Sequence, residues 1–208
     1  FQSKNDISIG QVLRRLPGIT VSDAGQISYK GQPIKNFYIE GLDLMKGRYG
    51  IATNNIDPNS ISTIEVLENH QDIKALKDLK PEERASINLK LKSGVKGVFN
   101  LIATLGGGYV DKLLWDNELI TTYFQRNSQL LATYKGNNSG TDLESELRSH
   151  TDYDYSRTST ISDIAMPATP GINKRYYYFN QSHSATYNQV FRVGKNGELG
   201  INAAYLND

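Results

Sequence analysis

Five runs of alternating apolar and polar residues in the second half of the chain constrain the fold more than any other feature. They cover residues 98–109, 114–125, 129–135, 176–193 and 198–205. Alternation at a period of two predicts strands with one apolar and one polar face. A membrane β-barrel turns the apolar face outward to lipid, whereas a soluble sheet turns it inward to a core. The alternation fits both and does not separate them.

The connections between these runs differ in length. Arg126-Asn127 and Gly194–Gly197 predict short turns, whereas residues 137–174 form a long polar connection rich in Ser, Thr, Asp and Gly. Short turns at one end of the strands and long loops at the other are typical of outer-membrane barrels, which have about eight strands or more. Because Phe1 is not a methionine and Asp208 directly follows a strand-like run, we expect the chain to be a fragment of a larger barrel.

The first 92 residues have a different pattern. Apolar residues from Ile7 to Leu16 recur at roughly helical spacing and stop at Pro17-Gly18, which predicts a helix followed by a turn. A second helix is expected at 69–79. Strand-like runs cover residues 19–21, 26–30, 34–39, 61–67 and 85–92. Both faces of 61–67 carry apolar residues, as a central strand should, and the early hairpin favours an α+β fold with a mixed sheet.

Composition and residue spacing exclude several functions. The formal net charge is +1 and there is no cysteine, so we expect no nucleic-acid partner, no disulfide framework and no thiolate metal site. The three histidines, His70, His150 and His183, lack ligand spacing. Gly106-Gly107-Gly108 lacks the lysine and the strand–turn–helix setting of a nucleotide loop. With no nucleophile–base pair in the sequence, we expect no enzyme, no catalytic residue, no metal and no cofactor.

Four segments carry a family resemblance. They are Leu13-Arg14-Arg15-Leu16-Pro17-Gly18-Ile19-Thr20-Val21, Phe37-Tyr38-Ile39-Glu40-Gly41, Asp57-Pro58-Asn59-Ser60-Ile61-Ser62-Thr63-Ile64-Glu65-Val66-Leu67 and Ala85-Ser86-Ile87-Asn88-Leu89-Lys90-Leu91-Lys92. In order and spacing they resemble the plug domain of TonB-dependent outer-membrane receptors. Residues 68–79 are similar to the Bacteroidota outer-membrane β-barrel type. The resemblance covers residues 7–92 closely, and residues 97–208 as the first strands of a barrel.

The resemblance implies an organisation into two domains. It assigns residues 1–92 to a plug domain and residues 93–208 to about five antiparallel transmembrane strands, the first ones of a β-barrel, with a long extracellular loop at 137–174. The whole barrel would have roughly 22 strands, as plugged outer-membrane transporters do. The chain would lie in the outer membrane of a Gram-negative bacterium, in contact with its lipid.

The implied function is ligand uptake by a receptor and transporter whose plug gates the barrel, with energy supplied through the TonB–ExbB–ExbD complex. A surface-exposed lipoprotein is a further implied partner. The alternative is a non-transporting outer-membrane surface protein that serves in adhesion or as a scaffold for such a lipoprotein. The ligand itself is not specified by any motif.

The resemblance also implies site residues. Residues 42–55 have no clean period, which predicts a loop or a short helical turn. Under the resemblance, residues 44–55 would form an apical plug loop that meets the ligand, with Arg48, Tyr49, Asn54 and Asn55 as candidate contacts; an ordinary solvated loop is the alternative. We expect Arg14 and Arg15 to pair with carboxylates at the wall of the barrel. The aromatic run at 176–178 would lie in the girdle at the membrane interface.

Overall fold

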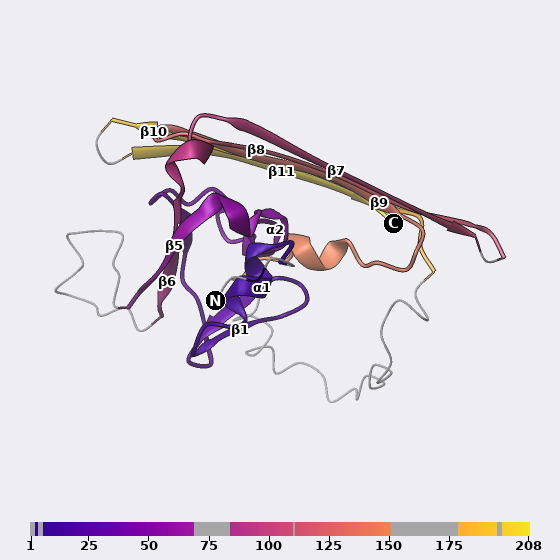
Figure 1. Cartoon of the computed structure of the whole chain (residues 1–208), viewed down its shortest axis with the longest axis horizontal. Helices are drawn as coiled ribbons and strands as arrows, with labels where there is room; N and C mark the ends of the chain where they lie inside the picture. The colour runs from indigo at the N-terminus through magenta and orange to yellow at the C-terminus, as the bar shows by residue number, and fades with distance from the viewer. Residues whose placement is uncertain (1–2, 4–5, 69–83, 110, 151–178, 195–196) are drawn as a thin grey trace, which may run out of the picture.

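A computed structural model gives the arrangement of most of the chain. It describes residues 3, 6–68, 84–109, 111–150, 179–194 and 197–208. The predicted helix at 69–79, the aromatic run at 176–178 and His70 lie outside these residues, as does the greater part of the 137–174 connection. In the described part, an α+β unit packs against one face of a five-stranded sheet (Figure 1).

The α+β unit consists of short elements. They are α1 (Ile9–Leu13), β1 (Ile19–Val21), β2 (Ile27–Tyr29), β3 (Gln32–Pro33), β4 (Phe37–Ile39), α2 (Tyr49–Asn55), the 3-10 helix η1 (Pro58–Ser60), β5 (Ile61–Leu67), β6 (Ser86–Leu91) and the 3-10 helix η3 (Ser93–Val95). One sheet has the antiparallel order β1-β2-β3 and the other the order β4-β6-β5. Strand β6 is parallel to β4 and antiparallel to β5, which confirms the predicted mixed sheet.

Two predictions for this unit were wrong in detail. Helix α1 is shorter than expected, since it ends at Leu13 and not at Leu16. The predicted turn follows at Gly18, where φ is +76°. The central strand is β6 and not β5. Strand β6 tolerates a polar residue at its centre because Asn88 is satisfied on both sides: its Nδ2 donates to Glu65 Oε2 at 2.7 Å, and its Oδ1 accepts from Gly41 N at 3.0 Å.

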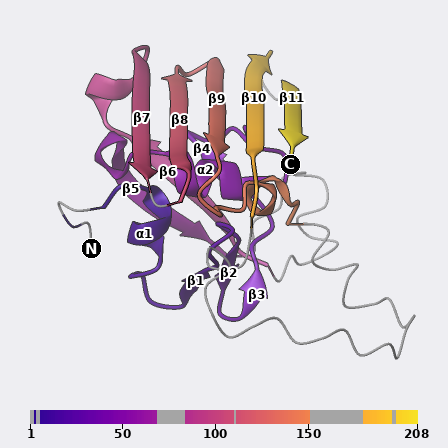
Figure 2. The ribbon, with the colours of Figure 1, turned by 90° about the vertical axis from the view of Figure 1, so that its right-hand side faces the viewer.

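The five predicted runs form the second sheet. Its strands are β7 (Phe99–Tyr109), β8 (Leu113–Phe124), β9 (Ser128–Asn137), β10 (Ser182–Val193) and β11 (Gly197–Asn207). They lie side by side in chain order and each neighbouring pair is antiparallel (Figure 2). Tight connections join β8 to β9 and β10 to β11, as the sequence predicted. Within the described residues, β7 and β11 each pair on one side only.

The strand register divides this sheet into two faces, because directly paired residues lie on the same side. One row across all five strands is Leu101, Thr121, Ala132, Tyr187 and Ala203, and the adjacent row is Ile102, Ile120, Thr133, Thr186 and Ala204. We call the side of the first row the outer face and the side of the second the inner face. Leu101 is 64% exposed, whereas Thr133 and Thr186 are each 6% exposed. The inner face is therefore the one covered by the α+β unit.

Charge separates the two faces completely within the strands. The strand residues with charged side chains are Asp116, Glu118, Lys135, Arg192 and Glu198. The register puts all of them on the inner face. The outer face carries large exposed apolar and aromatic side chains: Phe99, Leu101, Leu105, Tyr109, Leu113, Leu119, Tyr134, Tyr187, Leu199, Ile201 and Tyr205. The sheet thus turns its apolar side away from the rest of the molecule.

Candidate functional site

The candidate site is the contact between the α+β unit and the inner face of the sheet. A small apolar patch, formed by Phe124, Leu131 and Val190, joins the core of the α+β unit. Around it the contacts are polar: Gln129 Nε2 donates to Ile39 O at 2.8 Å, and Asn202 Nδ2 donates to Leu44 O at 2.9 Å. These hydrogen bonds fix the position of the unit on the sheet while little apolar surface is buried between them.

A salt bridge adds to these bonds at each side of the contact. Lys46 Nζ lies 3.0 Å from Glu198 Oε2, and Lys96 Nζ lies 3.1 Å from Glu40 Oε1. Burial opposes ionisation of Glu40, but the Leu91 N–H and the Lys96 ammonium outweigh it and lower the pKa of Glu40. These pairs are partly exposed, so each contributes at most about 1 kcal/mol.

The connection after β9 folds back onto the α+β unit. We call residues 138–150 the strap; it contains the 3-10 helix η4 (Glu144–Leu147), which lies against α2 (Figure 1). Leu147 packs on the core of the unit, and Leu143 is 7% exposed. The described start of the long connection is therefore a packed element; its extracellular location stays a prediction.

His150 fastens the end of the strap. Its backbone N–H donates to Gly47 O at 2.9 Å, and its Nε2 accepts from Ile27 N at 2.9 Å. The ring lies 4.9 Å from the Tyr49 ring, centroid to centroid, and the residue is 7% exposed. Burial lowers the pKa of His150 to about 4. Since Nε2 accepts a hydrogen bond, the neutral ring carries its proton on Nδ1.

Glu146 of η4 joins the strap to both parts of the molecule. Its Oε1 accepts from Asn54 Nδ2 at 3.2 Å and from Lys135 Nζ at 2.8 Å, and its Oε2 accepts from Asn55 Nδ2 at 3.3 Å. Lys135 also lies 2.9 Å from Glu118 Oε1. One carboxylate thus receives donors from helix α2 of the unit and from strand β9 of the sheet.

The four predicted ligand contacts lie at or next to this contact region. Arg48 precedes α2 and is half-buried, and Tyr49 is buried with its hydroxyl 3.2 Å from Asp43 Oδ2. Burial raises the pKa of Asp43, against hydrogen bonds from Asn36, Lys46 N and Tyr49.

The second half of the expected apical loop is a helix. Residues 49–55 form α2, which confirms the short helical turn of the two predicted forms. The strap covers the Asn54 and Asn55 amides, so the alternative of an ordinary solvated loop was wrong there. The sequence did not show this cover, because the strap lies more than 90 residues further along the chain. The role of the four residues in ligand binding stays a prediction.

Sequence reasoning missed Glu146 and His150 as contact residues. One signal was present: Leu143 and Leu147 stand four residues apart in an otherwise polar connection, the spacing of neighbours on a helix face. The predicted pairing of Arg14 and Arg15 with the sheet was also wrong.

Both arginines find partners inside the α+β unit. Arg14 lies 3.3 Å from Asp23 and also donates to Val21 O at 3.0 Å, and Arg15 pairs with Asp6. The Arg15 hydrogen bond lowers the pKa of Asp6. Each of these acidic partners lies nine residues from its arginine along the chain.

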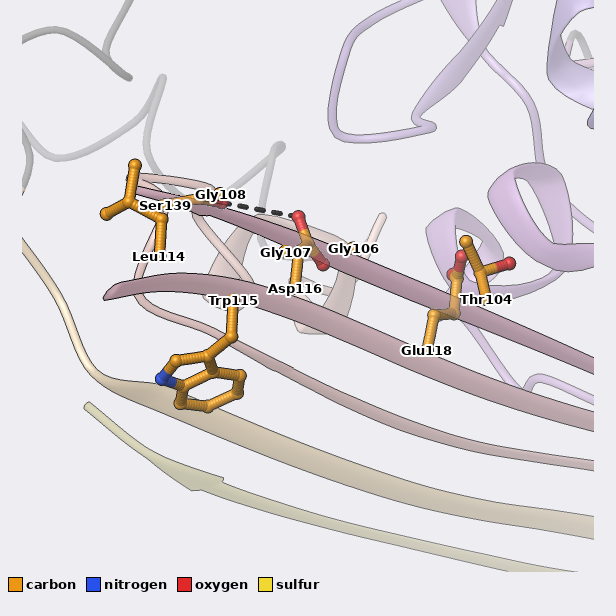
Figure 3. A pocket seen from close by; sticks show the side chains of 9 residues that line it. All are labelled: Thr104, Gly106, Gly107, Gly108, Leu114, Trp115, Asp116, Glu118 and Ser139. Carbon is orange, nitrogen blue, oxygen red and sulfur yellow. Dashed lines mark hydrogen bonds between the residues drawn. The ribbon is translucent and has the colours of Figure 1, made fainter. Parts of the chain in front are cut away.

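The inner face also carries a hollow of about 450 Å³ over β7 and β8. Thr104, Asp116 and Glu118 project to one side of the strands there and Trp115 to the other, and Ser139 Oγ donates to Asp116 Oδ2 at 3.3 Å (Figure 3). The strand glycines Gly106, Gly107 and Gly108 leave the space open. Among the described residues no group of three or more His, Cys, Asp or Glu side chains could hold a metal ion.

Comparison with known proteins gives one distant structural match. No protein-family model matches the chain, and no curated protein does. Among solved structures, the chain is similar to the alcaligin outer membrane receptor FauA from Bordetella pertussis, with a TM-score of 0.35 and 13% sequence identity. The match covers 96% of this chain and 36% of that receptor chain. No helix in the part that the structure describes is long and apolar enough to span a membrane.

Proposed function

We propose that the chain is the plug domain and first barrel strands of a TonB-dependent outer-membrane receptor of the Bacteroidota type. The α+β unit occludes the lumen, and the sheet is the beginning of a transmembrane wall. Ligand binds from outside, and the TonB–ExbB–ExbD complex supplies the force that displaces the plug. The protein carries out no covalent chemistry.

The polarity of the two sheet faces carries this proposal. A soluble sheet packed on an α+β unit would bury its apolar face against that unit. Here the unit covers the charged and polar face, and side chains such as Leu101, Leu105 and Tyr205 point away from it. A charge-free apolar face across five strands suits lipid, and a polar inner face suits a water-filled lumen.

Two further observations support the proposal. Among the described residues, no strand pairs with the outer edges of β7 and β11, each 11 residues long, and such edges suit further strands on both sides. Around its small apolar patch, the contact between unit and sheet consists of single hydrogen bonds and partly exposed ion pairs. Such a contact can be broken and restored at a lower cost than a fully apolar interface, as a removable plug requires.

The class of protein is tested on the full-length protein. It is expressed in a Gram-negative host, the membranes are fractionated, and gel mobility is compared before and after boiling. We expect the protein in the outer-membrane fraction, with a folded band that shifts on boiling. A protein that stays in solution without detergent and shows one mobility would overturn the proposal.

Transport is tested separately from the class of protein. Uptake of glycans, peptides and metal chelates is measured in strains that lack this gene or the gene for TonB. Loss of uptake of the same compound in both strains supports energised transport. Normal uptake in both strains, with the protein present in the outer membrane, instead supports a surface protein for adhesion or for holding a lipoprotein.

A further inference from the structure

We propose that Asn54, Asn55 and Lys135 form a binding site for a carboxylate group of the ligand, which Glu146 of the strap occupies in the structure described here. The inference rests on the proposed receptor function and adds the chemical class of the ligand. The strap is then a tethered competitor that an incoming carboxylate displaces.

The geometry of the donors matches a carboxylate. Asn54 and Lys135 donate to one carboxylate oxygen, at 3.2 and 2.8 Å, and Asn55 donates to the other at 3.3 Å. Recognition of both oxygens by separate donors fixes the plane as well as the position of the group. A lone ion pair that only neutralised a charge would need just one of these contacts.

Two of the three donors have a second partner besides Glu146. Asn55 Nδ2 also donates to Ile51 O at 2.7 Å, inside α2, and Lys135 Nζ also lies 2.9 Å from Glu118 Oε1, inside the sheet. Two elements of regular structure therefore fix the donors, whereas the acceptor lies on the connection between two strands. Asn55 and Lys135 therefore keep a partner when η4 moves away.

Burial makes the site selective for charge. The side chains of Lys135 and Glu146 are 14% and 18% exposed. A cation with so little water near it favours an anion over a neutral group of the same shape more strongly than an exposed cation does. Because Glu118 already pairs with Lys135, the site matches a single carboxylate and not a multiply charged anion.

The tether sets the strength of the competition. A group linked to its site by a short connection acts at an effective concentration of about the millimolar range. A small free carboxylate therefore competes poorly with Glu146. Removal of the Glu146 carboxylate alone should expose the site.

The test compares Glu146→Ala with Glu144→Ala in the full-length protein in detergent. Glu144 is the matched control because it belongs to the same 3-10 helix and has an exposed side chain. Its carboxylate lies 3.6 Å from the guanidinium of Arg148. Acetate and its neutral counterpart acetamide are titrated, and binding is followed on the probe by saturation-transfer NMR. This readout depends neither on uptake nor on the membrane fraction, so it fails independently of the proposed function.

We expect acetate to bind Glu146→Ala at least about tenfold more tightly than the wild type or Glu144→Ala, a difference of about 1.4 kcal/mol. Acetamide should give no saturable signal, and Lys135→Gln in the Glu146→Ala background should abolish the acetate signal. Glucuronate and N-acetylglycine then distinguish an acidic sugar from a peptide terminus, since the tighter of the two indicates the source of the carboxylate.

Equal acetate signals in all three proteins would overturn the proposal and leave Glu146 as a structural ion pair only. If Glu146→Ala does not fold, which boiled and unboiled gel mobility detects, Glu146→Gln replaces it, since the glutamine keeps the volume of the side chain. Acetate must then bind Glu146→Gln more tightly than Glu144→Gln; an equal affinity refutes the site.

Discussion

The α+β unit buries its apolar side chains, whereas the sheet exposes most of its own on the face that the unit does not cover. In the unit, Phe37 and Leu89 are 1% and 0% exposed, as in the hydrophobic core of a globular domain. In the sheet, Leu101 and Leu105 are 64% and 83% exposed, while Thr133 and Thr186 are buried. The difference shows that an alternating pattern defines two faces of a strand but does not define which face is covered. Only the position of the α+β unit supplies that information.

The largest expected effect tests the core side of this comparison. Phe37→Ala removes a fully buried ring and should destabilise the α+β unit by about 3–5 kcal/mol. Phe99→Ala is the matched change on the outer face, where the ring is 67% exposed and stacks on Tyr123 at 4.4 Å. Hydrogen exchange of the amides in β4 and β6 measures the stability of the unit. Faster exchange after Phe99→Ala than after Phe37→Ala would contradict the difference between the buried core of the unit and the exposed outer face of the sheet.

The next effect tests the outer face. Leu101→Arg puts a charge on the face proposed to contact lipid and should cost about 2–4 kcal/mol near the centre of a bilayer. Thr104→Arg puts the same side chain over the hollow on the inner face and should cost less than about 0.5 kcal/mol. The fraction of protein that folds into lipid vesicles, read from gel mobility without boiling, measures both. Similar folded fractions for the two variants would contradict a lipid-facing outer surface.

A third prediction concerns the strap, which connects the two parts. The pKa of His150 is about 4 in the folded protein and 6.5 in an unfolded one. The open strap therefore binds the proton more tightly, and closure is most stable above pH 6.5 and weakens as the pH falls toward 4. The loss is at most roughly 3 kcal/mol at low pH. Exchange of the His150 amide, bonded to Gly47 O, measures it between pH 4 and 7.

Two substitutions separate this titration from other groups. His150→Gln keeps an acceptor for the Ile27 N–H but does not titrate, so the exchange of the strap should lose its pH dependence in that window. His183→Gln changes a histidine on β10 that does not contact the strap and should keep the dependence. An unchanged pH profile in His150→Gln would assign the effect to another group.

The sequence predicted the local elements better than the contacts between them. Alternation located the ends of β7, β8, β9 and β11 to within two residues. It placed the start of β10 too early, since β10 begins at Ser182 and residues 179–181 are not strand. The short connection after β10 follows from its two glycines, Gly194 and Gly197. Helix α2 was harder to predict, because the sequence of this segment shows no helical period. Its end residues Tyr49 and Asn55 are buried only by tertiary contacts. The apolar pattern of residues 61–67 wrongly put β5 at the centre of its sheet, because a local pattern does not show which strand has neighbours on both edges.

The candidate site was less predictable than the fold for a physical reason. Asn54 and Asn55 were identified from a family position, but their partner Glu146 is more than 90 residues away in the chain. A polar connection between two strands gives no indication of the surface on which it packs. The charge of Glu146 matters only because Lys135 and the two amides surround it, and that arrangement exists only in the folded chain.

The smallest expected effect tests how closely the strap approaches α2. A Cβ added at Gly50 would lie 2.4 Å from Ala24 O and 3.1 Å from Glu146 O, both backbone atoms. Gly50→Ala therefore forces the hairpin after β1 or the strap away from α2 and should cost about 1–3 kcal/mol. Gly107→Ala is the matched change in the sheet, where a Cβ would meet nothing within 4 Å.

Exchange of the strap amides distinguishes these two glycines. Gly50→Ala should accelerate it and Gly107→Ala should leave it unchanged, because only the first glycine lies beneath η4. If both variants exchange like the wild type, the hairpin after β1 and not the strap takes up the added methyl group, since Ala24 O is the nearest atom to it. Faster exchange in Gly50→Ala alone indicates that η4 packs on α2 in solution, where Glu146 closes the Asn54 and Asn55 amides to a ligand.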